Sequence, residues 1–210
     1  MRENMRETAM TTTITMGTTN PAKIAQIASA LAPVGIEVVG VTDKRSLPEV
    51  VEDGATVQEN ARKKATCYAK ALGRRVFSMD NALYLQGLPP QDQPGIHVLR
   101  IGGQERSTDD ELLEHYQRVV RSLGDKVRGH WEFGVCVADP DGKVWETTIK
   151  SPRIFTSERS SSVVKGYPLE SIQIDPESGR YISEMSQAEQ SAFWQRMIGE
   201  ELIKFMRSIS

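Results

Sequence analysis

One stretch in the first half of the chain constrains the fold most, because it predicts a capped helix followed by a strand that delivers an aspartate. Thr56 is a suitable N-cap, and Glu59 follows at the position of a capping box. Small apolar residues then recur at helical spacing until Gly73 favours the end of the helix. The segment 75–78 predicts a short strand, with Asp80 at its carboxyl end. Ligands of open α/β sheets bind at that end, so Asp80 is a candidate metal ligand.

The opening segment predicts a site for an anion. Residues 12–17 are rich in β-branched side chains and predict the first strand. The polar turn 18–23 follows, and Pro21 suits the first position of a helix. A helix in that place presents free backbone N–H groups and a positive dipole end to a phosphate, and Lys23 adds a full charge. The alternative is a solvated lysine beside an ordinary N-cap.

The remaining pattern is typical of a mixed α/β protein. Hairpins dominate the second half of the chain, while the helices come from the first half and the end. We therefore expect a two-lobed α/β fold, in which helices flank one long mixed β-sheet and a cleft lies between the lobes. The further predicted elements are strands at 36–41, 83–85, 130–138, 144–150, 152–156 and 172–174, a helix at 108–123, and a last helix capped by Ser186.

Length and composition limit the classes of protein that the chain can belong to. The 210 residues fit one domain, which we place at 14–210 as a single bilobed unit behind a flexible tail at 1–13. The formal net charge of -2 argues against a general nucleic-acid binder, although a nucleotide needs only local positive charge. Cys67 and Cys136 form no metal or redox motif, which favours reduced thiols in a cytoplasmic protein. No apolar run approaches the ~18 residues of a membrane span, so no membrane partner is expected.

Several polar residues suit a polyphosphate and a divalent metal. Magnesium prefers carboxylate and phosphate oxygens, and lysines or arginines balance the charge of the phosphates. The acidic loop at 46–53 can equally be a solvated surface loop. The candidates are Thr18, Asn20 and Lys23 in the turn, Lys64 in the predicted helix, the carboxylates Glu49, Glu52, Glu59 and Asp80, and Arg196 near the C-terminus.

Five segments in order resemble the inosine triphosphate pyrophosphatase family, also called Ham1-like nucleoside triphosphate pyrophosphatases. Five motifs in sequence are far more specific than any one of them. The opening turn alone also resembles a smaller family of inosine/xanthosine triphosphatases, but the helix motif favours the first. Residues 18–23 resemble the family's T-G-N-x-x-K, 52–65 its E-x-G-x-T-F-x-E-N-A-x-x-K-A, 79–83 its D-D-S-G-L, 94–100 its P-G-I-Y-S-A-R, and 184–196 its E-L-S-x-x-E-K-x-x-x-S-H-R.

This resemblance implies hydrolysis of a nucleoside triphosphate to the monophosphate and pyrophosphate, with Mg2+ as cofactor and a homodimer as the assembly. No nucleic-acid polymer is expected as a partner. Asp80 would be the general base and, together with Glu52, a metal ligand; Glu49 or Glu59 are the alternatives to Glu52. The implied substrate-binding residues are Thr18, Thr19, Asn20, Lys23, Lys64, Asn81, Gly166, Tyr167, Gln195 and Arg196.

The sequence departs from the family pattern mainly where the base is read. The segment 165–168 replaces F-G-Y-D and so lacks its stacking ring and its aspartate. Gln190 replaces a lysine, and Trp194 with Gln195 replaces the serine and histidine of S-H-R, while Met79 replaces an aspartate at the phosphate end. Buried hydrogen-bonding groups discriminate strongly between bases, so we expect an altered base preference. The alternatives are a weak or inactive nucleotide-binding protein and a phosphatase acting on a related nucleotide.

Overall fold

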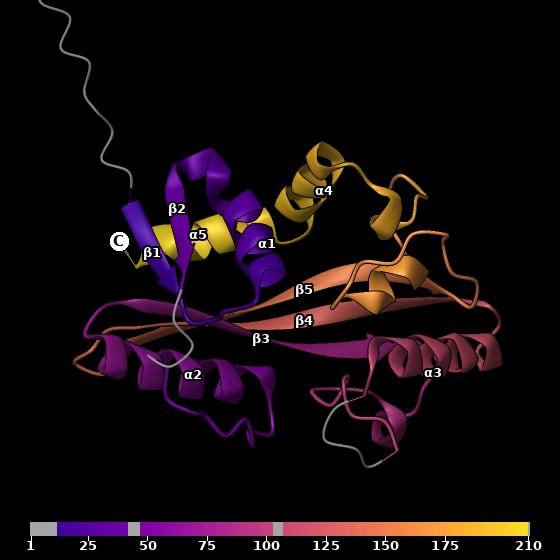
Figure 1. Cartoon of the computed structure of the whole chain (residues 1–210), viewed down its shortest axis with the longest axis horizontal. Coiled ribbons are helices and arrows are strands. Elements are labelled where there is room, and N and C mark those ends of the chain that lie inside the picture. The colour runs from indigo at the N-terminus through magenta and orange to yellow at the C-terminus, as the bar shows by residue number, and fades with distance from the viewer. Residues whose placement is uncertain (1–11, 42–46, 103–106, 210) are drawn as a thin grey trace, which may run out of the picture.

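A six-stranded mixed sheet organises the molecule. The computed structural model describes residues 12–41, 47–102 and 107–209 (Figure 1). The strand order is β2-β1-β3-β4-β5-β6. β1 pairs in parallel with β2 and β3, and the pairs from β3 to β6 are antiparallel. The strands are β1 (Thr12–Met16), β2 (Ile36–Gly40), β3 (Val76–Leu85), β4 (Lys126–Ala138), β5 (Val144–Thr156) and β6 (Gln173–Ile174).

Helices cover both faces of the sheet, as the sequence predicted. Figure 1 shows α2 and α3 below the long strands, with α1 and α5 above them beside β1 and β2, and α4 above them on the other side of α1. No helix in the described part of the chain is long and apolar enough to cross a membrane. The helices are α1 (Pro21–Leu31), α2 (Val57–Leu72), α3 (Asp109–Ser122), α4 (Gln187–Trp194) and α5 (Glu200–Ser208), and the 3-10 helix η4 spans Pro168–Ile172.

Three expectations about the elements were wrong in detail. The predicted strands 75–78 and 83–85 are one strand, β3, so Asp80 lies in mid-strand rather than at a carboxyl end. The reason is pairing: β1 accompanies only the start of β3, whereas β4 pairs along its whole length. The strands expected at 144–150 and 152–156 are likewise one, β5. The last helix continues from α4 to α5 through a π-helical segment, Gln195–Gly199, instead of being α-helical throughout.

The cap of α2 is only half of the predicted capping box. The Thr56 hydroxyl accepts a hydrogen bond from the Glu59 N–H, as expected. The Glu59 carboxylate, however, accepts from the Ala55 N–H at 2.8 Å rather than from the N-cap residue. The full capping box forms instead at Thr108 and at Ser186, where α3 and α4 begin.

The long strand β3 is shared by two hydrophobic cores. Its first half, including Phe77 and Met79, packs in a core with β1, α1 and α5. Its second half, including Leu83 and Leu85, packs in another core with α3 and η4. Asp80 lies between the two sets. The strand therefore presents its polar residues at the junction of the two lobes.

A glycine sets how closely α2 approaches the sheet. Gly134 in β4 pairs with Asp80 in β3. A Cβ at Gly134 would lie 2.5 Å from the carbonyl carbon and oxygen of Val57, the first residue of α2. Any larger residue there must push the start of α2 away, because the obstructing atoms are backbone and cannot rotate aside.

We expect Gly134→Ala to destabilise the protein by about 1–3 kcal/mol, because it overpacks a contact between backbones. The measurement is the midpoint of urea unfolding, compared with wild type at equal slope. Lys150→Ala on the neighbouring strand is the control, since the Lys150 side chain is 66% exposed and surface changes are close to neutral. An unchanged midpoint for Gly134→Ala would show that α2 does not depend on this contact.

Candidate functional site

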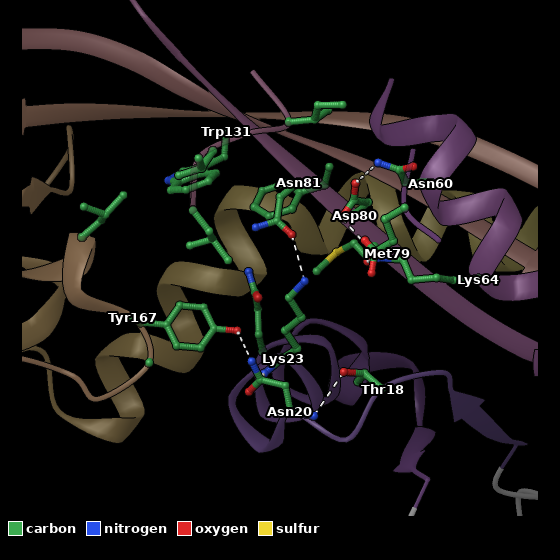
Figure 2. Close-up of a pocket in the computed structure, with 18 of the residues that line it drawn as sticks. Thr18, Asn20, Lys23, Asn60, Lys64, Met79, Asp80, Asn81, Trp131 and Tyr167 are labelled. Carbon is green, nitrogen blue, oxygen red and sulfur yellow. Dashed lines mark hydrogen bonds and ion pairs between the residues drawn. The ribbon is translucent and has the colours of Figure 1, made fainter. Parts of the chain in front are cut away.

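The polar residues of β3 open into a cavity of about 590 Å3 between the lobes. This volume suits a small-molecule ligand. Figure 2 shows side chains from the opening turn, α2, β3 and β4 converging on it. Among the candidate site residues proposed from the sequence, those that line it are Thr18, Thr19, Asn20, Lys23, Glu52, Lys64, Asp80, Asn81, Gly166 and Tyr167.

A buried lysine links the two carboxylates at one end of the cavity. The Lys64 Nζ lies 2.9 Å from Glu52 Oε2, 3.2 Å from Asp80 Oδ1 and 3.3 Å from the Met79 carbonyl oxygen. Asn60, one turn before Lys64 on α2, donates to Asp80 Oδ2 at 3.0 Å. Burial alone would lower the pKa of Lys64, but Asp80 and Glu52 outweigh it, and the pKa is raised. Lys64 therefore carries a positive charge at neutral pH.

A second lysine reaches the same end of the cavity from α1. The Lys23 Nζ donates to Asn81 Oδ1 at 3.1 Å (Figure 2). Burial lowers the pKa of Lys23 to about 8, and repulsion from Lys64 acts in the same direction, while Asp80 and Glu52 oppose both. A polyphosphate would meet two cations here, one of which titrates close to neutral pH.

The turn before α1 is capped by its own side chain, which corrects one expectation. Asn20 Oδ1 accepts from the N–H groups of Ala22 and Lys23, at 3.0 and 3.5 Å. These two N–H groups are therefore not free for an anion, as the sequence had suggested. The Asn20 N–H donates to Thr18 Oγ1 at 3.1 Å, which fixes the shape of the turn.

Glu52 and Asp80 are the carboxylates that could hold a metal. Mg2+ commonly binds through one or two carboxylates together with substrate phosphates and waters, so this pair fits such an ion. In the described residues no group of three or more His, Cys, Asp or Glu side chains could hold a metal. Of the alternatives to Glu52, Glu49 is exposed outside the cavity lining, and Glu59 accepts a hydrogen bond from the Ala55 N–H.

The opposite end of the cavity is aromatic. In Figure 2, Trp131 and Tyr167 lie on the far side of Asn81 from Asp80. The Trp131 indole donates to Gln173 Oε1 at 2.8 Å, which fixes its ring, and the Tyr167 hydroxyl accepts from Asn20 Nδ2 at 3.5 Å. Trp194 also lines the cavity, and its partly buried side chain packs against the core that includes β1, α1 and α5.

Two predicted binding residues do not line this cavity. Gln195 Nε2 donates to the Ser29 carbonyl at 3.3 Å, and so ties the π-helical segment to α1. Arg196 forms ion pairs with Asp175 at 2.8 Å and Glu177 at 2.6 Å. In this structure both side chains hold the C-terminal helices in place, and their role in substrate binding stays a prediction.

Sequence reasoning missed several residues of the lining, among them Asn60, Trp131 and Glu170. Asn60 is polar on the face of α2 whose neighbours are the buried Ala61 and Ala65, and a polar residue at such a position is a usable signal. Trp131 and Phe133 are two residues apart in β4 and so lie on the same face of the strand, and both line the cavity. Glu170 gave no signal, because a short 3-10 helix has no diagnostic pattern.

The comparisons with known proteins agree on one family. The model of the Ham1 family matches residues 14–201. A dITP/XTP pyrophosphatase from a Bradyrhizobium species is 34% identical over 137 residues, covering 63% of this chain and 62% of that protein. Another from an Exiguobacterium species is 26% identical over 197 residues, covering 91% of this chain and 97% of that protein. The Ham1 protein structure of Staphylococcus aureus has a TM-score of 0.71 at 20% identity, covering 94% of this chain and all of that one, which supports the fold.

We expect the affinity of the site for inorganic triphosphate to fall as pH rises above about 8. A lysine is neutral above its pKa, and the folded protein lowers the pKa of Lys23 from 10.5 to about 8. Binding an anion must then restore the proton, which weakens binding by up to about tenfold per pH unit. The measurement is calorimetric titration between pH 6.5 and 9.5, with those limits set at about 1.5 units on either side of the pKa.

The matched variant for this test is Lys23→Arg, since a guanidinium stays charged over the whole range. Its affinity should vary with pH only through the titration of the ligand itself, which is common to both proteins. Identical pH profiles for the two proteins would contradict a role for Lys23 in binding the anion.

Proposed function

The chain belongs to the Ham1 family, and from this premise we propose that it is a nucleoside triphosphate pyrophosphatase that releases pyrophosphate and a monophosphate, with Mg2+ as cofactor. The observation that carries the proposal is the position of Asp80. Its carboxylate is held by Asn60 and Lys64 at the polar end of a cavity whose other end is aromatic. That arrangement accommodates a phosphate tail at one end and a base at the other.

The lysines supply the binding of the phosphates. Lys23 and Lys64 reach the cavity from opposite elements, α1 and α2, and so balance charge on both sides of the tail. Their charge also favours the transition state, in which negative charge moves onto the leaving pyrophosphate. Thr18 and Asn20 would place the tail, since the turn that they form borders the same space.

Asp80 is the group that would take the proton of the attacking water. Asn60 donates to one carboxylate oxygen and Lys64 to the other, which fixes the orientation of the carboxylate. A general base acts efficiently when it is held within hydrogen-bond reach of the water. Glu52 and Asp80 would hold Mg2+ when it is bound, and the ion would neutralise phosphate charge. Lys64 must release part of its contact with both carboxylates to admit the ion.

We infer that the base preference differs from that of inosine and xanthosine triphosphate. The motif residues at 165–168 and 190–195 differ from the family pattern. Gln195 and Arg196 contact Ser29, Asp175 and Glu177 rather than the cavity. A different set of side chains must therefore face the base.

A second candidate is a nucleotide-binding protein that has lost turnover. The observation that favours it is the pairing of Lys64 with both carboxylates, together with Met79 in place of an acid. A cation already balances the charge that would attract the metal. Turnover assays separate this candidate from the first.

Two further properties stay predictions from the resemblance to the family. We expect the protein to act in the cytoplasm and to form a homodimer. The molar mass by light scattering checks the second: the monomer is 23.4 kDa. A mass near that of a single chain at micromolar concentration would contradict the dimer.

We expect Asp80→Asn to lower kcat about 10^2- to 10^4-fold, because the variant keeps the shape of the side chain but loses the base. The assay quantifies pyrophosphate, phosphate and monophosphate released from ribo- and deoxynucleoside triphosphates with Mg2+, and a chelator should abolish activity in wild type. Asp53→Asn is the matched control, since Asp53 is exposed, pairs with Lys63 and does not line the cavity.

The product pattern decides between the candidates. Monophosphate with pyrophosphate supports the pyrophosphatase, and release of phosphate alone would replace it with a phosphatase acting on a related nucleotide. Nucleotide binding without any product would favour the inactive binding protein. Wild-type activity in Asp80→Asn would overturn the assignment of the base.

A further inference from the structure

A carboxylate lies at the aromatic end of the cavity. Glu170 lines it together with Tyr167, from the first turn of η4, whose N-cap is Tyr167. Trp131 faces the same space from β4 (Figure 2). Two aromatic residues and one carboxylate in the same lining supply what a base requires, namely stacking surfaces and a group that hydrogen-bonds to its edge.

The charge of Glu170 is balanced at a distance rather than by a hydrogen bond. Within the described residues, no donor is hydrogen-bonded to its carboxylate. Arg153 in β5 attracts it electrostatically, and the Nε and Nη2 atoms of Arg153 are buried without a hydrogen-bond partner there. Burial raises the pKa of Glu170 to about 7, and Arg153 opposes that rise. Both carboxylate oxygens are therefore available as acceptors above neutral pH.

We propose that Glu170 selects a base whose edge presents two adjacent N–H donors, as guanine does with its ring N1–H and exocyclic amino group. The proposal rests on the proposed function and names the substrate class of the same site. A carboxylate offers only acceptors, so it pairs with both donors of this edge at once. Ring-oxidised guanines that keep this edge belong to the same class.

Other common bases lack this pair of donors. Hypoxanthine has one N–H beside a carbonyl, xanthine has an N–H between two carbonyls, and adenine has an amino group beside a ring acceptor. Each would leave one carboxylate oxygen unpaired or facing another acceptor. An unpaired buried polar group discriminates between ligands by about tenfold or more.

The test compares kcat/KM for dGTP and dITP at about pH 8, one unit above the pKa of Glu170 and so with the carboxylate ionised. We expect wild type to prefer dGTP by about tenfold or more. Glu170→Gln should lower that ratio about tenfold, because a carboxamide offers one acceptor and one donor and so pairs equally well with the N1–H and O6 that guanine and hypoxanthine share. Glu158→Gln is the control, since Glu158 is exposed and outside the lining.

A second variant guards against loss of folding. Glu170→Asp keeps the negative charge opposite Arg153 but withdraws the carboxylate by one methylene. It should lose the preference for dGTP without gaining one for dITP. Melting temperatures of both variants show whether the comparison is made on folded protein.

Equilibrium binding of dGMP and dIMP separates this inference from the proposed function, because it needs no turnover. Tighter binding of dGMP that depends on Glu170 would support base selection even if no triphosphate is hydrolysed, and the proposed function alone would then fail. Folded Glu170→Gln with the wild-type ratio would overturn the inference and leave Glu170 as a counter-ion of Arg153. Absence of binding by every nucleotide would overturn both.

Discussion

The close approach of α2 to the sheet is the constraint on which the site depends. Gly134 stands opposite Asp80 in the pairing of β4 with β3, and the backbone of Val57 lies against it. Because no side chain intervenes, Asn60 and Lys64 come within hydrogen-bond reach of Asp80. A glycine in the interior of a strand weakens the strand. In this protein the glycine weakens β4, but it also lets Asn60, Lys64 and Asp80 come together.

The same strand explains why the cluster faces a cavity rather than a core. β3 is buried in one hydrophobic core before Asp80 and in another after it. Between the cores lie the polar residues Asp80 and Asn81, which need hydrogen-bond partners. Lys64 of α2 donates to Asp80, and Lys23 of α1 donates to Asn81. The cluster has nearly balanced charge, with two lysines and two carboxylates. An entering polyphosphate therefore changes its balance and must compete with internal ion pairs.

The sequence predicted the parts of the site that rest on local chemistry. Capping by Thr56, the helical face of α2 and the turn at Asn20 follow from short-range patterns, and the structure bears out the helices that they begin. The position of Asp80 in mid-strand could not be predicted, because it depends on pairing with β4, which is distant in the chain. The ion-pair partner of Arg196 could not be predicted either, because Asp175 lies in a turn 21 residues earlier in the chain. Gly134 was visible as a strand glycine, but its meaning needed the packing of α2.

The two ends of the cavity differ in how strongly a substitution disturbs the packing around them. The phosphate end is built from helix termini and a strand whose positions the two cores fix, so a substitution there disturbs packing as well as chemistry. The base end is built from η4, β4 and β5. There Glu170 interacts with Arg153 electrostatically and without a hydrogen bond. A substitution at Glu170 changes a carboxylate of the cavity lining, while Leu169 and Ile172 on the same 3-10 helix stay packed in the second core. Base recognition can therefore diverge while Asp80, Lys64 and Lys23 keep the geometry that phosphate chemistry requires.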